Sequence, residues 1–374
     1  MVIGVVKESK EFESRVALSP EVVKLLVKKE FNVVIESGAG ESSFFSNQEY
    51  QEAGAKIGTS KEALAADLIL KVNLVSLEEV AEMKEKSACM SFMYAHQHPE
   101  VLQALNKKSI TSFSMDAVPR ISRAQKMDAL SSQANLAGYK AVILGANRLG
   151  KIFPLLMTAS GTITPARVLI FGAGVAGLQA IATAKRLGAV VECTDVRPET
   201  KEQVESLGGR FLSVEGAEGV QTEGGYAKEV SAAYLEKQQA LIREKIKEAD
   251  LVITTALVMG KKSPILVTED MVKSMKTGSV IVDMAVASGG NCAISEANAT
   301  VVKHGVTLIG ESNLPSLLPV NASQLYATNI STLVLHLASK DGFSLDLEDE
   351  ITKGVLITHQ GELVHEFTKK LLNT

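Results

Sequence analysis

The segment that most restricts how this chain can fold is VLIFGAGVAGLQAIATAKRLG, in which a short apolar run precedes closely spaced glycines and a helix-like stretch. The run Val168–Phe171 predicts a strand, and Gly172, Gly174 and Gly177 follow it at G-x-G-x-x-G spacing. The first glycine permits a tight turn, the second leaves room for a pyrophosphate, and the third lets the helix pack closely on the strand. We therefore predict a dinucleotide-binding strand–turn–helix unit, with the helix in LQAIATAKRLG. The alternative is a glycine-rich turn that serves packing alone.

The strand-like run VVECTD that follows this helix ends on a carboxylate, Asp195. A carboxylate at this place accepts hydrogen bonds from the adenosine ribose hydroxyls and repels a 2′-phosphate, which predicts NAD(H) and not NADP(H) as the cofactor. Arg197, two residues further on, leaves another interpretation open, because arginine near this position also accepts a 2′-phosphate. The other roles expected for Arg197 are covering the adenine and pairing with a carboxylate.

Strand-like and helix-like segments alternate along the chain. The runs VIGVV, FNVVIES and DLILKVN alternate with helical stretches such as PEVVKLLVKKE, and the rhythm restarts after a long helix predicted over residues 126–150. Five further strands are predicted beyond that helix, in RVLIF, AVVECTDV, LVITTAL, SVIVDMAV and GVTLIG. This alternation predicts an α/β fold with two Rossmann-like, doubly wound domains and mainly parallel sheets.

The last part of the chain is predicted to return to the first domain. Helix-like SQLYATNISTLVLHLAS and strand-like GVLITHQGELV come after the second set of strands is complete. The first Rossmann-like domain is therefore expected to be discontinuous, with residues 1–125 and 320–374. The NAD-binding domain then spans residues 126–319 and includes the connecting helix 126–150.

The composition excludes several classes of partner. The 39 Lys and Arg and 43 Asp and Glu residues are well mixed and give a formal net charge of −4. This leaves no basic field to neutralise a phosphate backbone, which argues against a nucleic-acid partner. Cys89, Cys193 and Cys292 lie far apart without metal-ligand spacing, so we expect reduced thiols and no metal site. The most apolar stretch is glycine-studded and too short for a comfortable membrane span, which predicts a soluble chain.

Two further stretches are predicted near the cofactor, because ligands of such sheets bind at the carboxyl ends of the strands. The backbone at Ala256 and Leu257, in TTALVMG, follows one strand and is expected to approach the cofactor. The loop GAEGVQTEGGYAKE, residues 216–229, combines glycines such as Gly225 with one aromatic side chain, Tyr226. That composition suits a lid, and a solvated surface loop is the equally open alternative.

The segment PRISRAQKMDALSSQANLAG, residues 119–138, gathers polar side chains just upstream of the glycine turn. Ser122 and Gln125 match a capping box at the start of the long helix, which gives both residues a structural interpretation. A polar stripe at helical spacing is formed by Asp128, Ser131 or Ser132, and Asn135. Arg120 and Asp128 are placed to pair across the helix start, with Gln125 between them to bind an amide or a hydroxyl.

The chain resembles the NAD(H)-binding component of proton-translocating NAD(P) transhydrogenase in the motifs PRISRAQKMDALSSQANLAGYKAV, GAGVAGLQAIATAKRLGA, TDVRPETKEQVESLGG, GGYAKE, ITTAL and GSVIVDMAV…GGNC. The resemblance covers essentially the whole chain. It implies that Arg120, Gln125 and Asp128 hold the nicotinamide end of NAD(H), with Ser131 nearby, and that Tyr226 belongs to a mobile lid. The nucleotide-binding residues that it implies are Gly172, Gly174, Val175, Gly177, Asp195, Val196, Arg197 and Ala256.

The same resemblance implies a homodimer that docks onto a membrane-spanning component and an NADP(H)-binding component. In such an assembly this chain passes hydride between NADH and NADP⁺ held by the partner subunit, while protons move through the membrane component. The chain would then lie in the cytoplasm, peripheral to the cytoplasmic face of the inner membrane, or in the mitochondrial matrix of a eukaryote.

The chain is similar, more distantly, to alanine dehydrogenase. Arg15 and Lys71 match that family's pattern, and His96 is a third candidate. Where the dehydrogenase reads V-D-V-A-x-D-Q-G-G, this chain carries Ala287 in place of the second aspartate. Alanine does not relay a proton, which argues against amino-acid oxidation and favours a structural interpretation of the three polar residues. A regulatory NAD-binding module without chemistry is a further alternative.

Overall fold

The chain forms two compact units, one discontinuous and one continuous. A computed structural model describes residues 1–213, 222–223, 226–227, 232–257 and 262–372. The first unit comprises residues 1–133 and 315–374, and the second comprises residues 134–314. The division lies inside helix α6 (Ala129–Arg148), whereas the sequence predicted it at residues 125/126. The reason is that the first turn of α6 is bonded to α11 (Pro319–Leu337), through side chains described below.

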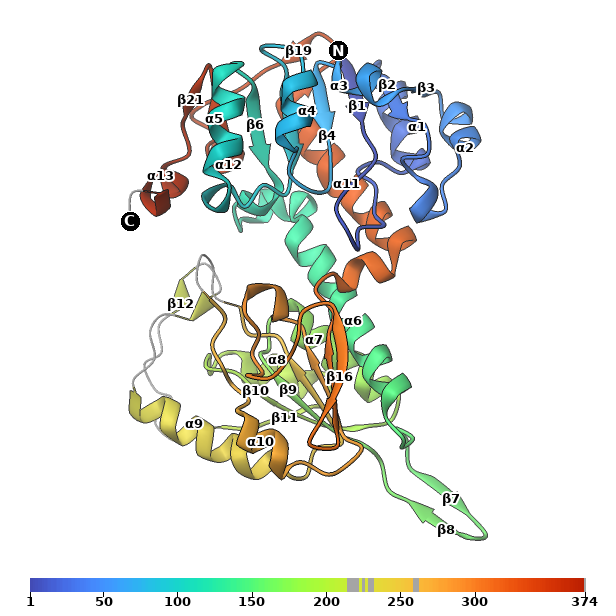
Figure 1. Cartoon of the computed structure of the whole chain (residues 1–374), viewed down its shortest axis with the longest axis vertical. Helices are drawn as coiled ribbons and strands as arrows, with labels where there is room; N and C mark the ends of the chain where they lie inside the picture. The colour runs from blue at the N-terminus through green and yellow to red at the C-terminus, as the bar shows by residue number, and fades with distance from the viewer. Residues whose placement is uncertain (214–221, 224–225, 228–231, 258–261, 373–374) are drawn as a thin grey trace. The chain divides into compact units, whose positions relative to one another are not determined.

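The first unit is built on an eight-stranded sheet of order β21-β20-β6-β5-β4-β1-β2-β3 (Figure 1). Its strands are β1 (Val2–Val5), β2 (Asn32–Glu36), β3 (Lys56–Gly58), β4 (Leu68–Leu70), β5 (Ala88–Ser91), β6 (Thr111–Ser114), β20 (Leu356–His359) and β21 (Glu362–Leu363). Strands β1 to β6 are parallel, and β20 returns antiparallel to β6. The order 3-2-1-4-5-6 within the parallel part is that of a doubly wound sheet.

Alternate side chains along these strands belong to two hydrophobic layers, one on each face of the sheet. Leu68 and Leu70 pack in the cluster that contains α1 (Pro20–Lys28) and α11, while Ile69 between them packs in the cluster that contains α5 (Pro99–Lys107). A parallel strand that is buried on both faces is apolar throughout, which explains the uninterrupted run LIL.

The remaining helices of the first unit are short, and most of them begin at a side-chain cap. They are α2 (Asn47–Glu52), α3 (Ser60–Leu64), α4 (Leu77–Glu82), α12 (Glu350–Val355) and α13 (Glu366–Leu372). Capping boxes start α2, α3 and α4, in which a Ser or Thr and a Glu three residues later exchange hydrogen bonds with the backbone. These caps stop each helix from extending back into the preceding loop.

The second unit contains a seven-stranded sheet of order β11-β10-β9-β14-β15-β17-β16. Its strands are β9 (Arg167–Phe171), β10 (Val190–Thr194), β11 (Arg210–Phe211), β14 (Leu251–Thr254), β15 (Val280–Asp283), β16 (Ala299–Lys303) and β17 (Val306–Gly310). Its helices include α7 (Val175–Arg186), α8 (Thr200–Ser206), α9 (Ala232–Lys245) and α10 (Glu269–Ser274). Val168 and Ile170 pack toward α6 and α7, and Leu169 and Phe171 pack toward α10 on the opposite face.

The predicted fold class is confirmed: both units are α/β with mainly parallel sheets, and the first is discontinuous. The five strands predicted for the second unit are β9, β10, β14, β15 and β17. The short β11 and the antiparallel edge strand β16 were not predicted. The latter alternates exposed and half-buried residues along ATVVK, so it lacks the apolar run that marks a central strand.

Candidate functional site

The glycine turn joins β9 to α7, and its three glycines meet different surroundings. Gly172 has φ 101°, a left-handed conformation that favours glycine, and its N–H donates to the carbonyl of Thr194 at 2.9 Å. A Cβ on Gly177 would lie 1.8 Å from the carbonyl oxygen of Gly172. A Cβ on Gly174 would have Arg197 Nη2, at 3.9 Å, as its nearest neighbour. Packing therefore requires glycine at positions 172 and 177, while space is left open beside Gly174.

That open space lies at the amino end of α7. Gly174 is the N-cap residue, so no side chain caps the helix, and Val175 at the first helical position is exposed. Free N–H groups and the positive end of the helix dipole make such a terminus suited to an anion. The turn thus combines room, hydrogen-bond donors and a favourable field, which are the three requirements for holding a pyrophosphate.

Asp195 and Arg197 form a closely bonded pair beside the turn. The Asp195 carboxylate is buried and accepts the N–H of Ala173 at 2.6 Å. Arg197 donates through Nε at 2.9 Å to one carboxylate oxygen and through Nη2 at 2.9 Å to the other. Of the roles considered for Arg197, pairing with a carboxylate is the one this geometry shows. Val196 lies between them and is half-buried.

A buried amide that was not predicted from the sequence holds the backbone at Ala256. Asn291 accepts the N–H of Ala256 at 3.0 Å and donates to its carbonyl at 2.9 Å. The carboxylate of Asp283, at the end of β15, in turn accepts the N–H groups of Asn291 and Cys292 and the hydroxyl of Thr254. This network fixes the loop after β14. Asn291 follows Gly289 and Gly290, and that pair of glycines was the signal that could have drawn attention to it.

The neighbouring residue on this loop, Leu257, is half exposed although it is a large apolar residue. Thr255, two residues before Leu257, donates its hydroxyl to the carbonyl of Phe171 at 3.0 Å. This bond connects the loop to the glycine turn. The loop after β14 and the turn after β9 therefore form one bonded cluster at the carboxyl edge of this sheet.

In the first unit, the predicted capping box at Ser122 and Gln125 is wrong. Residues Ser122–Met127 form a separate 3-10 helix, η4, whose cap position is Ile121 and makes no side-chain capping bond. Helix α6 begins after it, at Ala129, and its first turn is capped by Asp128. The Asp128 carboxylate accepts the N–H of Ser131 at 2.9 Å through Oδ1 and the hydroxyl of Ser131 at 2.6 Å through Oδ2. A carboxylate caps orphan N–H groups as well as a serine does, so the helix starts later than the motif suggested.

The 3-10 helix η4 exposes its polar residues and buries its apolar ones. Ala124 and Met127 lie in the hydrophobic core of the first unit, whereas Gln125 and the preceding Arg120 are exposed. Two of the predicted polar residues are thus presented on the surface. Asp128, which caps α6, is half-buried.

The predicted lid, residues 216–229, lies largely outside the described residues, and Gly225 is among those outside. Tyr226 belongs to the short strand β13 (Tyr226–Ala227), whose backbone pairs antiparallel with β12 (Thr222–Glu223). The Tyr226 side chain lies outside what the structure describes.

Arg15 and Lys71 have their charges matched by carboxylates of the same unit. Arg15 is buried and donates to both oxygens of Glu13, at 2.8 and 2.7 Å. Burial opposes ionisation of Glu13, but its bonds with Arg15 outweigh this effect and lower its pKa to about 2. Lys71 is buried as well and donates to Glu79 at 2.6 Å, the same Glu79 that closes the capping box of α4. A buried cation that already has a bonded partner is poorly placed to receive a substrate carboxylate.

The other two residues of the dehydrogenase comparison are partly or fully accessible. His96 is half-buried in the 3-10 helix η2 (Ala95–Gln97), with its Nε2 3.3 Å from the side-chain amide of Gln97. Ala287 is exposed in the 3-10 helix η5 (Val286–Ser288), and a methyl group has no proton to give or take.

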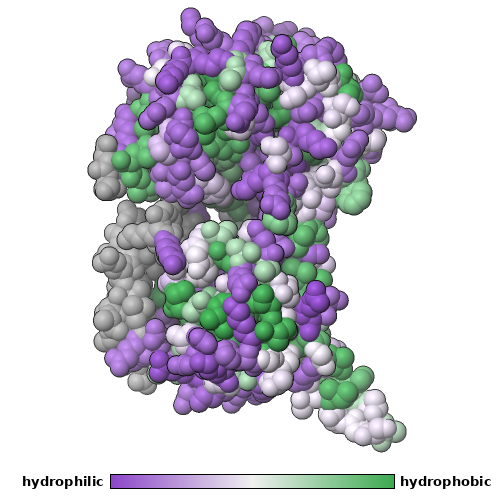
Figure 2. Space-filling model, viewed as in Figure 1, coloured by the Kyte–Doolittle hydropathy of each residue, from purple (hydrophilic) through white to green (hydrophobic). Residues whose placement is uncertain are grey.

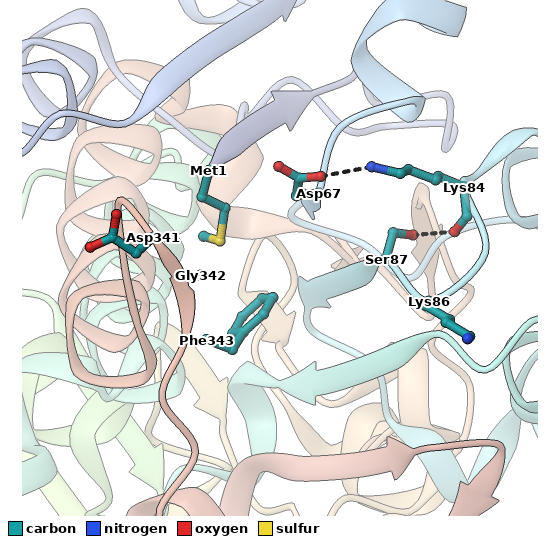
Figure 3. Close-up of a pocket in the computed structure, with 8 residues that line it drawn as sticks. All are labelled: Met1, Asp67, Lys84, Lys86, Ser87, Asp341, Gly342 and Phe343. Atoms are coloured by element: carbon teal, nitrogen blue, oxygen red, sulfur yellow. Dashed lines mark hydrogen bonds and ion pairs between the residues drawn. The ribbon is translucent and has the colours of Figure 1, made fainter.

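A cavity of about 330 Å³ lies in the first unit, at the amino ends of the parallel strands of its sheet (Figure 3). Its walls include Met1, Asp67, Lys84 and Phe343. Asp67 accepts the N–H of Val2 at 2.9 Å and pairs with Lys84 at 3.0 Å, so these charges already hold the fold together. None of the predicted site residues lines this cavity.

Both units match the domains of one known protein family. Residues 4–137 match the N-terminal domain of alanine dehydrogenase/PNT, and residues 141–366 match the C-terminal domain of the same family. The chain belongs to the alanine dehydrogenase/PNT family. The resemblance stated from sequence motifs is thereby confirmed.

Within the alanine dehydrogenase/PNT family, transhydrogenase subunits are more similar to this chain than alanine dehydrogenases are. A polypeptide of the NAD(P) transhydrogenase subunit alpha of Rhodospirillum rubrum is 49% identical over 98% of each chain. A solved transhydrogenase structure from Sinorhizobium meliloti is 42% identical, with a TM-score of 0.86 over 98% of this chain and 100% of that one. The alanine dehydrogenase of Bacillus subtilis is 30% identical over 98% of this chain and 93% of its own length.

Among the helices that the structure describes, none is both long enough and apolar enough to cross a membrane.

Proposed function

We propose that this chain is the NAD(H)-binding component of a proton-translocating NAD(P) transhydrogenase. The observation that carries the proposal is the open space beside Gly174 at the uncapped amino end of α7, next to the buried Asp195 carboxylate. It provides a place for a pyrophosphate and, alongside, an acceptor for ribose hydroxyls. The similarity to transhydrogenase alpha subunits over 98% of the chain decides among the enzymes that use such a site.

NADH supplies the hydride in this reaction, and the residues of this chain bind and orient it. Gly172, Gly174 and Gly177 shape the pyrophosphate site, and the backbone at Ala256 approaches the cofactor. The other proposed binding residues of the second unit are Val175, Asp195, Val196, Arg197, Gly225 and Leu257.

Positioning of the nicotinamide is the proposed role of Arg120, Gln125 and Asp128, with Ser131 supporting Asp128 through its two hydrogen bonds. Tyr226 is proposed to act in a lid over the site. Direct transfer needs the donor and acceptor carbons to approach to about 3–3.5 Å in alignment, and this geometry alone supplies several kcal/mol of the barrier. No general acid or base is required, in keeping with a site made of clamping residues.

We further propose that NADP(H) is held by a separate subunit and that protons move in a membrane-spanning component. The chain would then be peripheral to the cytoplasmic face of the inner membrane, or to the matrix face in mitochondria.

Mixing the chain with the NADP(H)-binding component of a transhydrogenase tests the proposed function. We expect rapid hydride exchange between NADH and an NAD⁺ analogue, mediated by NADP(H) on the partner, and no alanine-dependent reduction of NAD⁺ by the chain alone. The paired cations Arg15 and Lys71 and the methyl group of Ala287 give the physical reason for the second result. Each component alone is the control. Alanine turnover by the chain without exchange in the mixture would favour the dehydrogenase, and NADH binding without either reaction would favour a regulatory module.

We propose that the chain forms a homodimer through a hairpin of the second unit. The hairpin consists of β7 (Leu156–Thr158) and β8 (Gly161–Ile163), and all of its strand residues are exposed (Figure 1). Met157 is 72% exposed and Leu155, just before β7, is 53% exposed. Figure 2 shows green, apolar residues where this hairpin leaves the unit. Exposed apolar side chains on a two-stranded ribbon need a covering partner, and a second copy of the chain supplies the same ribbon in return.

Sedimentation equilibrium tests the dimer. Wild type is expected to have twice the mass of one chain, and Met157→Lys is expected to shift it toward the monomer, because an ammonium group would be buried in the interface. Val302→Lys, at an exposed apolar residue of β16, is the matched control and should remain dimeric. A wild-type monomer at micromolar concentration would contradict the proposal.

A further inference from the structure

One buried amide on α11 ties together the two halves of the segment that carries Gln125 and Asp128. Asn329 is 8% exposed and lies in the middle of this helix. Its side-chain nitrogen donates to the backbone carbonyl of Lys126 at 2.9 Å, and its side-chain oxygen accepts the hydroxyl of Ser132 at 2.7 Å. A carbonyl only accepts, so the bond to Lys126 fixes which way the amide of Asn329 faces.

The two partners of Asn329 lie on opposite sides of a bend in the chain. Lys126 is near the end of the 3-10 helix η4, and Ser132 is in the first turn of α6. Asp128 lies between them with φ −72° and ψ 84°, which belongs to neither helix. The direction in which η4 leaves α6, and with it the placement of Gln125 relative to Asp128, therefore depends on contacts on both sides of the bend, among them the burial of Ala124 and Met127.

Helix α11 is a rigid support for such a restraint. Its residues Tyr326 and Ile330, on either side of Asn329, are completely buried in the core of the first unit. The hydroxyl of Tyr326 donates to the carbonyl of Lys71 at 2.7 Å, which bonds the helix to the loop after β4. A second hydrogen bond between α6 and α11 lies one residue beyond Ser132. There the side chain of Gln133 donates to the carbonyl of Ala322 at 3.0 Å.

We propose that Asn329 is a positioning residue for hydride transfer, which acts by holding the bend at Asp128 so that Gln125 and Asp128 keep a fixed mutual placement. The inference rests on the proposed function, because it assigns Asn329 to the same nicotinamide-holding segment. Asn329 lies outside that segment by some two hundred positions, so the spacing of the motif gives no hint of it. It is proposed to touch neither cofactor nor partner.

The test uses the full chain and compares Asn329→Ala with wild type in three measurements: NADH affinity by fluorescence titration, hydride exchange in the mixture with the NADP(H)-binding component, and the emission of bound NADH. We expect the exchange rate to fall roughly 10- to 100-fold while the NADH dissociation constant changes about twofold or less, because small displacements at a reacting centre cost rate and not affinity. The emission of bound NADH is expected to change, since it reports on the surroundings of the nicotinamide.

Three further variants sharpen the experiment. Asn329→Asp keeps an acceptor for Ser132 but loses the donor to Lys126, so it should be as slow as Asn329→Ala. Ser132→Ala removes one of the two bonds and should be slowed less. Thr332→Ala, on the same helix, is the control and should behave as wild type, because its hydroxyl bonds the Thr328 carbonyl of its own helix.

The outcomes separate the two proposals. An Asn329→Ala variant that unfolds at a lower temperature yet exchanges hydride at the wild-type rate would show a purely structural role and overturn the inference. If Asn329→Ala does not fold, wild-type exchange and unchanged NADH emission by Ser132→Ala would overturn it equally. A wild-type mixture that exchanges no hydride contradicts the proposed function itself, and the emission of bound NADH still decides whether Asn329 positions the nicotinamide.

Discussion

Gly174→Ala is expected to fold like wild type and to bind NADH about 100-fold more weakly, a loss of about 2.7 kcal/mol in binding free energy. The new Cβ meets no protein atom closer than 3.9 Å, and the backbone at this residue, with φ −76° and ψ −173°, is allowed for alanine. Alanine is a poorer N-cap than glycine but has less freedom in the unfolded chain, and the two effects are each below about 1 kcal/mol. The methyl group instead occupies the space that we propose for the pyrophosphate. Fluorescence titration and thermal unfolding measure the two quantities.

Two other glycines serve as controls for this substitution. Gly177→Ala would place its Cβ 1.8 Å from the Gly172 carbonyl oxygen, so the backbone must move and the unfolding free energy should fall by about 3 kcal/mol or more. Gly150→Ala meets nothing within 4 Å and should change neither measurement. Wild-type NADH affinity in Gly174→Ala would show that the pyrophosphate does not lie beside this residue.

NADH is expected to bind at least about 100-fold more tightly than NADPH. The Asp195 carboxylate is buried, and a 2′-phosphate about 4 Å from it would be repelled by roughly 4 kcal/mol at an effective dielectric constant of about 20. The guanidinium of Arg197, bonded to both oxygens of Asp195, offsets part of this repulsion, so the expected preference is set below the value that about 4 kcal/mol alone would give. Titration of the chain with each nucleotide gives the two dissociation constants.

Asp195→Ala should reduce or reverse this preference, since it removes the anion and releases Arg197 to meet a phosphate. Glu192→Gln is the matched control: Glu192 lies on β10, which ends just before Asp195, it bonds Lys245 at 3.3 Å, and its substitution should leave the preference unchanged. Equal dissociation constants for the two nucleotides in wild type would assign the 2′-phosphate role to Arg197.

The regions of this molecule that could be predicted from sequence are those in which the local sequence pattern and the tertiary contacts require the same residue types. The strand before Gly172 is apolar because it is buried on both faces; glycine is required at position 172 by its positive φ and at position 177 by the carbonyl oxygen of Gly172. Asp195 was found because its distance along the chain from the glycine turn is fixed by one helix and one strand.

The regions that could not be predicted depend on partners distant in sequence. Ser122 and Gln125 satisfy the spacing of a capping box, but Ala124 and Met127 are drawn into the core, and the chain forms a 3-10 turn before Asp128 starts the helix. Asn329 is a single amide in an otherwise ordinary helical stretch, and Asn291 is marked only by the two glycines before it. Their roles come from the carbonyl groups that the fold brings to them, which no local spacing encodes.

The order in which the sheet of the first unit is assembled follows from the return of β20. The hydroxyls of Ser112 on β6 and Thr358 on β20 lie 2.7 Å apart, although the two residues are 246 positions apart in the sequence. During synthesis the ribosome must produce the whole second unit before the strand that covers β6 exists, and until then β6 is an unpaired edge open to other chains. The second unit is one continuous segment, so all of its residues, the glycine turn included, are synthesised before the last strands of the first sheet.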